Sequence, residues 1–192
     1  EPMFTALQAL LNTWAVSFDL PILDWIQAHL QCGFLDKVMP IITLFGDGGV
    51  FWILVAVALL LFARYRKTGF SMGMALILGL LVCNIFLKPQ VARIRPYDYQ
   101  WQYFQKEITL LISAQHDFSF PSGHTIASFE ACTVLMLHDK RMGIPATVLA
   151  ILIAFSRLYL YVHYPTDVLV SLVLGILFGF LGNFLVNLIY KK

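Results

Sequence analysis

The stretch DVLVSLVLGILFGFLGNFLVNLIY, residues 167–190, decides the fold, because it carries no charge after its first residue. A helix of this length and polarity crosses the roughly 30 Å hydrocarbon core of a bilayer. A second run, GVFWILVAVALLLFA at residues 49–63, has the same character. The composition of the whole chain agrees: 59% of its 192 residues are hydrophobic and 12% are charged. In a soluble domain about half of the residues are apolar and about a quarter are charged. The sequence therefore predicts an integral membrane protein.

Further apolar segments divide the rest of the chain, and we predict a single membrane-embedded, all-α domain over residues 1–192. The segment at 33–47 is the weakest candidate span because it carries Asp36, Lys37 and Pro40. Residues 4–31 alternate apolar and polar stretches and are interrupted by Pro21, so we expect a helix lying in the membrane interface. The expected six-transmembrane-helix bundle has spans at approximately 33–47, 48–63, 69–88, 121–138, 142–162 and 165–190.

Basic residues between the spans predict the orientation of the bundle. Six spans bring three basic clusters and both termini to one side, which the positive-inside rule makes cytoplasmic. The opposite side receives the turn at 46–49, the loop 89–120 and the turn around His163. That loop is itself basic, which calls for a functional explanation. The clusters are Arg64, Arg66 and Lys67; Lys140 and Arg141; and Lys191 and Lys192.

Charge and cysteine content exclude other classes of protein. The formal net charge is only +2, and no basic patch interleaved with aromatic residues occurs, so no nucleic-acid partner is expected. The three cysteines have no spacing suited to a metal and are interpreted as packing residues. The sequence leaves the oligomeric state open.

The motif PSGH at residues 121–124 opens the fourth span. Pro121 suits a first helical turn, Ser122 offers a hydroxyl, and Gly123 lets the backbone approach a ligand closely. Backbone N–H groups at such a helix start point at an anion, with the helix dipole behind them. The motif thus favours an anion site that includes His124. The alternative is a capped helix start with an incidental histidine.

Cationic residues stand at the same ends of two other spans. Lys88 and Arg95 lie in KPQVARIRP, residues 88–96, and Arg157 lies in SRLYLYVHYPTD, residues 156–167. Such side chains supply the positive charge that a phosphoryl group needs. The alternative is snorkelling of long side chains to the interface. Arg157 resists that alternative, because it lies among apolar residues before the span ends.

His163 and Asp167 are four residues apart across Pro165, so the carboxylate can reach back to the imidazole. A carboxylate in this position fixes the tautomer and leaves the other ring nitrogen free to attack. One alternative is a helix N-cap beside an interfacial histidine. Another is a metal site built from His116, His124, His163 and Asp167. We expect no metal and no other cofactor, since the lysine and arginines already supply cationic charge.

These three motifs, in this order, resemble the signature of the type 2 phosphatidic acid phosphatase family. The resemblance implies a six-span enzyme with an extracytoplasmic site and a phosphohistidine formed on His163. It further implies that Asp167 orients His163, and that His124 protonates the leaving oxygen and later serves as base for water. The matched positions are Lys88, Arg95, Pro96, Pro121, Ser122, Gly123, His124, Ser156, Arg157, His163 and Asp167. Of these, we expect Lys88, Arg95, Ser122, Gly123 and Arg157 to bind the substrate.

The chain is similar to compact bacterial members of that family, whose implied substrates are undecaprenyl diphosphate, phosphatidylglycerophosphate and phosphatidic acid. We favour undecaprenyl diphosphate, because an outward-facing site matches where cell-wall synthesis releases this carrier lipid. Two alternatives stay open, a phosphatase of small sugar phosphates and a non-catalytic lipid transporter. Apart from the lipid substrate, the expected partners are membrane lipids.

Overall fold

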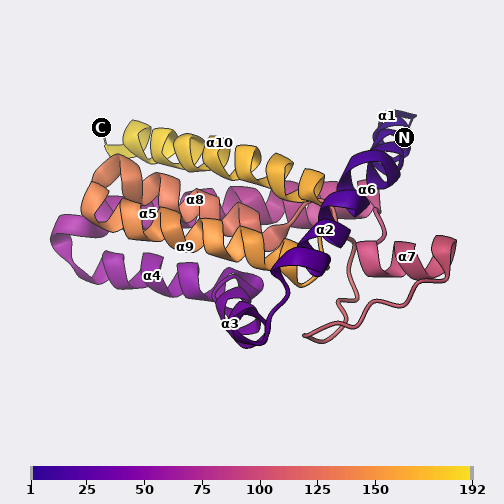
Figure 1. The fold of residues 1–192 in the computed structure, drawn as a ribbon. Coiled ribbons are helices and arrows are strands. Elements are labelled where there is room, and N and C mark those ends of the chain that lie inside the picture. Colours follow the sequence, from indigo (N-terminus) through magenta and orange to yellow (C-terminus); the bar gives the residue numbers. More distant parts are fainter. Residues whose placement is uncertain (1, 191–192) are drawn as a thin grey trace.

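The computed structural model describes residues 2–190, and these residues form helices and loops without a strand. The all-α prediction is confirmed. The helices that lie lengthwise beside one another in Figure 1 are α4 (Val50–Leu61), α5 (Arg66–Gly79), α8 (Gly123–His138), α9 (Lys140–Tyr159) and α10 (Pro165–Tyr190). Helix α8 packs against α5, α9 and α10 and is the most buried of them.

Small residues on α10 allow this close packing. A Cβ atom on Gly175 would lie 2.8 Å from the Cβ of Phe129 on α8. One on Gly182 would lie 2.7 Å from the backbone nitrogen of Ala75 on α5. Glycine at these positions lets helix backbones approach within a membrane bundle.

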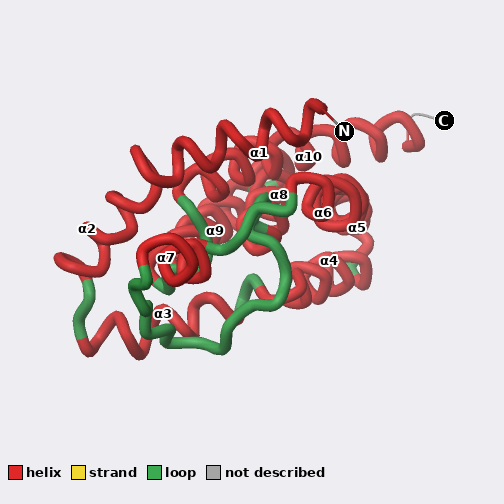
Figure 2. The backbone as a smooth tube through the Cα atoms, turned by 90° about the vertical axis from the view of Figure 1, so that its right-hand side faces the viewer, coloured by secondary structure: helices red, strands yellow, loops and turns green. Residues whose placement is uncertain are grey.

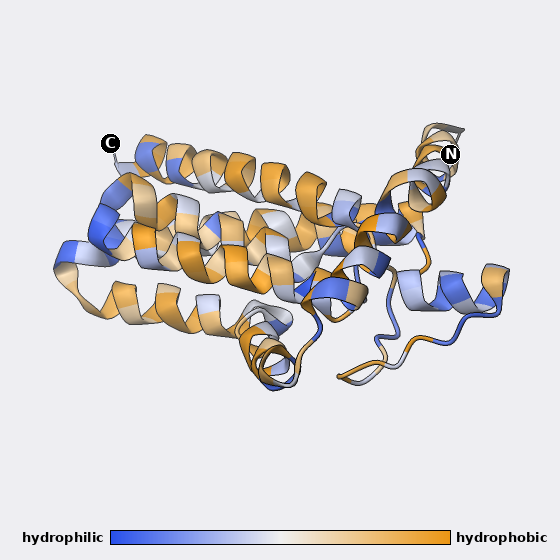
Figure 3. Ribbon diagram, in the orientation of Figure 1, coloured by the Kyte–Doolittle hydropathy of each residue, from blue (hydrophilic) through white to orange (hydrophobic). Residues whose placement is uncertain are grey.

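The outer surface of the bundle is apolar (Figure 3), as contact with lipid requires. Within residues 2–190, four helical segments are long and apolar enough to cross a membrane. Helix α8, with 16 residues, is shorter than these and lies inside the bundle. The four segments are Gly33–Leu61, Ala63–Phe104, Lys140–Tyr159 and Pro165–Tyr190.

The N-terminal region crosses one end of the bundle. It consists of α1 (Pro2–Trp14), the π-helical segment η1 (Ala15–Asp19), α2 (Leu20–Leu30) and α3 (Gly33–Leu44). Helix α3 is seen end-on in Figure 1 and lengthwise in Figure 2, whereas α4 is lengthwise in Figure 1. The segment 33–47 therefore runs across the bundle and differs from the lengthwise span that we expected.

A glycine-rich turn explains this change of direction. Gly48 and Gly49 have φ angles of 56° and 68°, which residues with a Cβ atom rarely adopt. They allow the chain to turn sharply between α3 and α4. The first described residues consequently lie at the opposite end of the bundle from the end of α10 (Figure 1), whereas we expected both termini on one side.

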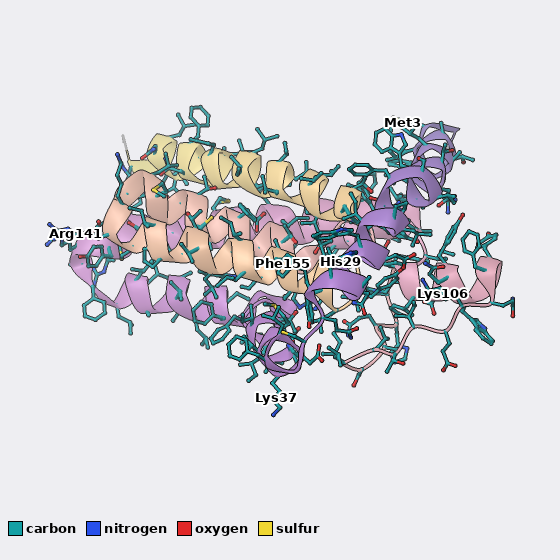
Figure 4. The ribbon with its side chains drawn as sticks, in the orientation of Figure 1. Met3, His29, Lys37, Lys106, Arg141 and Phe155 are labelled. Carbon is teal, nitrogen blue, oxygen red and sulfur yellow. The ribbon has the colours of Figure 1, made fainter. Side chains whose placement is uncertain are left out.

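The basic turns gather at the end of the bundle remote from the N-terminal region. One turn contains η3 (Ala63–Tyr65) and joins α4 to α5, and the other joins α8 to α9. Figure 4 shows Arg141 at this end and Lys106 at the other. The predicted grouping of the first two clusters agrees with this arrangement. Lys191 and Lys192 lie outside the described residues.

Two further helices interrupt the expected loop 89–120. Helix α5 continues through the π-helical segment η4 (Leu80–Leu87) into α6 (Lys88–Val91). Helix α7 (Pro96–Phe104) follows, and an irregular segment then returns the chain to α8. All these segments meet at the end of the bundle that the N-terminal region covers (Figure 1).

Candidate active site

A cavity of about 510 Å³ opens between the turn before α4, α4, the continuous helix of α5, η4 and α6, the first turns of α8 and the end of α9. The three sequence motifs, which are far apart in the chain, meet here. Ser122 and Asp167 do not line the cavity, although both are fully buried beside residues that do. The predicted residues that line it are Lys88, Arg95, Gly123, His124, Arg157 and His163.

His163 is 1% exposed, and its imidazole lies between a carboxylate and a guanidinium. Its Nδ1 is 3.6 Å from Oδ2 of Asp167, and its Nε2 is 3.3 Å from Nη1 of Arg95. Burial first, and then the positive charges of Arg95, Arg157 and Lys88, hold the pKa of His163 well below its ordinary value. The imidazole is therefore neutral near pH 7, which leaves a ring nitrogen free to act as a nucleophile.

Asp167 is held by Arg93, a residue that the motif analysis did not single out. The Arg93 guanidinium donates hydrogen bonds to Asp167, to Oδ2 of Asp19 at 2.7 Å and to Oγ1 of Thr166 at 2.8 Å. Its Cζ also lies 3.7 Å from the ring centroid of Tyr164. This network is buried and ties the N-terminal region to the carboxylate behind His163.

His124 has a carboxylate partner of its own. Oδ1 of Asp47, in the turn before α4, lies 2.6 Å from Nε2 of His124 in the first turn of α8. Gly46 makes room for the ring, because a Cβ atom there would lie 2.6 Å from Cδ2 of His124. The sequence predicts a turn at 46–49 on the side of the motifs, and the structure shows that this turn also brings the Asp47 carboxylate to His124.

Asp117 bridges two of the predicted phosphate-binding residues. Its Oδ2 accepts a hydrogen bond from Nζ of Lys88, and its Oδ1 accepts one from Nη2 of Arg95, each at 2.5 Å. Burial acts to raise the pKa of Asp117, but the hydrogen bonds and charges of Lys88 and Arg95 outweigh it and lower the pKa to about 2. The carboxylate thus contacts both cations in the way that phosphoryl oxygens would.

Arg157 presents unpartnered donors to the same cavity. Its Nη1 donates to Oγ1 of Thr43 at 2.6 Å, while Nε and Nη2 have no hydrogen-bond partner in the described chain. The residue is 1% exposed. Buried polar groups are normally hydrogen-bonded, so the free edge of this guanidinium indicates a site for an anion.

The PSGH segment both caps its helix and forms a wall of the cavity. Oγ of Ser122 accepts a hydrogen bond from Oγ1 of Thr125 at 3.0 Å, and Ser122 is the N-cap of α8. Gly123 lines the cavity, where a Cβ atom would lie 3.1 Å from Oδ1 of Asn84. Within this motif, Ser122 acts as the helix cap, and Gly123 faces the cavity in which an anion site is predicted.

The metal interpretation needs four ligands that the fold does not gather. His116 is exposed on the segment before α8 and does not line the cavity. Over residues 2–190, the histidine, cysteine and acidic side chains nowhere form a group of three placed to hold a metal ion. The cavity and the buried Asp167 beside it instead bring together two imidazole–carboxylate pairs, a lysine and two arginines, a set suited to phosphoryl transfer.

Comparison with known proteins gives a consistent result. The PAP2 superfamily model matches residues 68–190. An undecaprenyl-diphosphatase of Sulfolobus acidocaldarius is 33% identical over 168 residues, which cover 87% of this chain and 78% of that protein.

Two solved structures are also similar to this fold. LpxE of Aquifex aeolicus has a TM-score of 0.73 at 27% identity and covers 85% of this chain and 93% of its own. A transmembrane PAP2-type phosphatidylglycerolphosphate phosphatase of Bacillus subtilis has a TM-score of 0.71 at 28% identity and covers 94% of this chain and 90% of its own.

Proposed function

This chain belongs to the PAP2 superfamily and is a lipid phosphatase, and from that premise we propose that it hydrolyses undecaprenyl diphosphate without a metal, through a phosphohistidine on His163. One observation carries the proposal. A buried imidazole lies between Asp167 and Arg95, in a cavity where two guanidinium nitrogens of Arg157 have no hydrogen-bond partner within residues 2–190. A nucleophile and an anion site therefore share one wall.

In the first step, Nε2 of His163 attacks the terminal phosphorus atom. The P–N bond forms while the bond from phosphorus to the bridging oxygen breaks. Asp167 stabilises the positive charge that develops on the imidazole, and His124 donates a proton to the leaving oxygen. Undecaprenyl phosphate departs.

In the second step, water hydrolyses the phosphohistidine. His124, now neutral, accepts a proton from the water molecule as its oxygen attacks phosphorus. The P–N bond breaks, inorganic phosphate leaves and both imidazoles return to their starting states. Asp47 holds His124 in place and favours its protonated form in each turnover.

The phosphoryl oxygens bind to Lys88, Arg95 and Arg157 in this mechanism. Two of these cations, Lys88 and Arg95, contact Asp117. Asp117 is half exposed and lies on the irregular segment before α8, so its carboxylate gives way when the substrate enters.

We further propose that the site faces the extracytoplasmic surface. The basic turns at Arg64 and Arg141 lie at the opposite end of the bundle, and such residues favour the cytoplasmic side. Helices α1 to α3 then lie in the outer interface, which their exposed Trp14 and Trp25 suit. In this arrangement the C-terminal end of α10 is cytoplasmic, and the crossings are α4, α5 with η4, α8, α9 and α10.

The substrate assignment is supported by the similarity to the undecaprenyl-diphosphatase of Sulfolobus acidocaldarius. Phosphatidylglycerophosphate is the second candidate, because the similar Bacillus subtilis structure is a phosphatase of that lipid. Apolar residues extend the cavity between α4, α5 and α8, as a lipid tail requires.

The test is inorganic phosphate release in detergent with excess EDTA. The substrates are undecaprenyl diphosphate, phosphatidylglycerophosphate, phosphatidic acid and a soluble sugar phosphate. We expect the intact protein to act on undecaprenyl diphosphate, His163→Ala to release nothing and His116→Ala, a control on an exposed histidine, to match the intact protein.

Three results would count against the proposal. Loss of activity in EDTA would overturn the metal-free mechanism. Preference for the sugar phosphate would overturn the lipid assignment. Lipid binding without phosphate release would favour the transporter.

A further inference from the structure

The cavity continues along the bundle beyond the groups that bind phosphate. Its deeper wall is apolar and includes Ile53 of α4, Leu80 of η4 and Ile126 of α8. Glu130 of α8 also lines this part of the cavity, whereas Asp47 and Asp117 line it beside the phosphate-binding groups. Glu130 follows His124 by six residues on α8, so it lies about 9 Å further along the helix axis.

The carboxyl of Glu130 is buried, and residues 2–190 offer it no hydrogen-bond or ion-pair partner. The residue is 1% exposed, and its Oε1 makes no hydrogen bond within residues 2–190. It forms none of the ion pairs found in that part of the chain. Buried acidic groups inside membrane helices are costly and mark functional sites. The mechanism above makes no use of this one.

The neighbouring helix makes space for the carboxyl. A Cβ atom on Gly79 of α5 would overlap the carboxyl of Glu130 in its present conformation, so the glycine leaves room for that carboxyl. The packing of α5 against α8 therefore accommodates a polar group whose Oε1 no atom of residues 2–190 satisfies.

The chemistry of this group restricts what it binds. A carboxyl with no cation beside it in apolar surroundings takes its neutral form, which donates one hydrogen bond through its O–H. Its complement is a neutral acceptor oxygen. A glycerolipid phosphate carries ester carbonyl oxygens one glycerol unit beyond its phosphate. A polyprenyl chain carries no oxygen beyond its phosphates.

We propose that Glu130 determines specificity by donating a hydrogen bond to an ester carbonyl of a glycerolipid phosphate bound with its phosphate at His163. The inference rests on the proposed function and extends it, because it names the residue that distinguishes ester-linked glycerolipid phosphates from polyprenyl diphosphates at the same site. Polyprenyl diphosphates fill the apolar part of the cavity without this contact.

The experiment compares dioleoyl phosphatidic acid with its dialkyl ether analogue, which keeps the chains and the phosphate but lacks both carbonyls. The readout is kcat/KM in mixed micelles. For the intact protein we expect the ester lipid to exceed the ether lipid by roughly three- to tenfold, the value of one hydrogen bond. Glu130→Gln keeps a donor and should keep the preference. Glu130→Leu should abolish it while leaving undecaprenyl diphosphate unaffected.

Binding provides a second readout that needs no turnover. In the His163→Ala variant, the ester lipid should raise Tm more than the ether lipid, and adding Glu130→Leu should remove the difference. This binding measurement tests the role of Glu130 separately from the proposed phosphatase activity, because it gives a result even if the intact protein releases no phosphate. Equal response of the intact protein to both lipids in both readouts would overturn the inference. So would a Glu130→Leu variant that loses every substrate in equal proportion.

Discussion

Oδ1 of Asp47 lies 2.6 Å from Nε2 of His124, so the glycine-rich turn before α4 reaches the first turn of α8. This contact gives the second histidine of the site an acidic partner, as Asp167 does for His163. The two pairs have different tasks in the proposed mechanism. One imidazole must be neutral to attack phosphorus, and the other must carry a proton to the leaving group.

Asp47→Asn should therefore slow catalysis by a factor that depends on how much the leaving group needs a proton. The amide no longer favours a protonated His124, so we expect kcat for a lipid phosphate to fall by about 10²-fold, the usual scale of general acid catalysis. An aryl phosphate needs little protonation of its leaving group and should lose much less. Asp98→Asn is the control, because Asp98 is exposed on α7 and does not line the cavity. Equal losses on both substrates would argue that Asp47 has only a structural role.

Asp19→Asn tests the buried network behind Asp167. Asp19 accepts hydrogen bonds from Arg93 and from the backbone N–H and hydroxyl of Thr166. Removing its charge leaves the buried guanidinium undercompensated, so we expect a stability loss of about 3 kcal/mol and a fall in kcat with KM nearly unchanged. Thermal unfolding in detergent and steady-state kinetics measure the two effects.

Asp24→Asn is the matched control for that variant. Asp24 is on the same N-terminal region, but its side chain is half exposed; it contacts Lys106 and accepts a hydrogen bond from Tyr161, which the amide oxygen of asparagine can also accept. We expect close to wild-type stability and activity. A wild-type kcat in Asp19→Asn would show that the N-terminal region does not position the nucleophile.

The motifs predicted most residues of this site, because the residues of each motif are close together in the sequence and lie at the same end of a helix. His163 and Asp167 are four apart, and the structure shows them facing each other. The missed partners, Asp47, Asp19 and Asp117, contact the motifs from segments distant in sequence. Neither spacing nor hydropathy reports such contacts.

The fold shows the same division. Hydropathy predicted the apolar segments and the all-α class, but it carries no information on the direction of a helix. The backbone angles at Gly48 and Gly49 decide that α3 crosses the bundle. Glu130 did offer a signal, since an acidic residue within an apolar helix is unusual, yet only the cavity relates it to the site.

Asp117→Asn should strengthen the binding of anions. The wild-type carboxylate occupies donors of Lys88 and Arg95, and an amide competes for them less well. We expect the inhibition constant of inorganic phosphate to fall several-fold, with a parallel fall in KM. Product inhibition measured at neutral pH checks this. A weaker inhibition would mean that Asp117 instead holds the two cations in position for the substrate.

The contacts of Asp117 with Lys88 and Arg95 have a defined pH dependence. The pKa of Asp117 in the folded protein is about 2, below its ordinary value of 3.8. Its contribution to stability is therefore present in full above the ordinary value and is lost as the pH falls toward 2. The effect of Asp117→Asn on phosphate inhibition should accordingly be constant between pH 5 and pH 8, where the wild-type carboxylate stays ionised.

The acid limb of the activity profile reports on His163. Burial and the positive charges of Arg95, Arg157 and Lys88 oppose protonation, so the folded pKa lies below the ordinary 6.5. After correction for ionisation of the substrate, kcat/KM should stay level as the pH falls through 6.5 and should decline only at more acidic pH. Arg95→Gln removes one opposing charge, so the limb should move to higher pH while the maximal rate falls. A limb that stays in place in Arg95→Gln would show that a different group controls it.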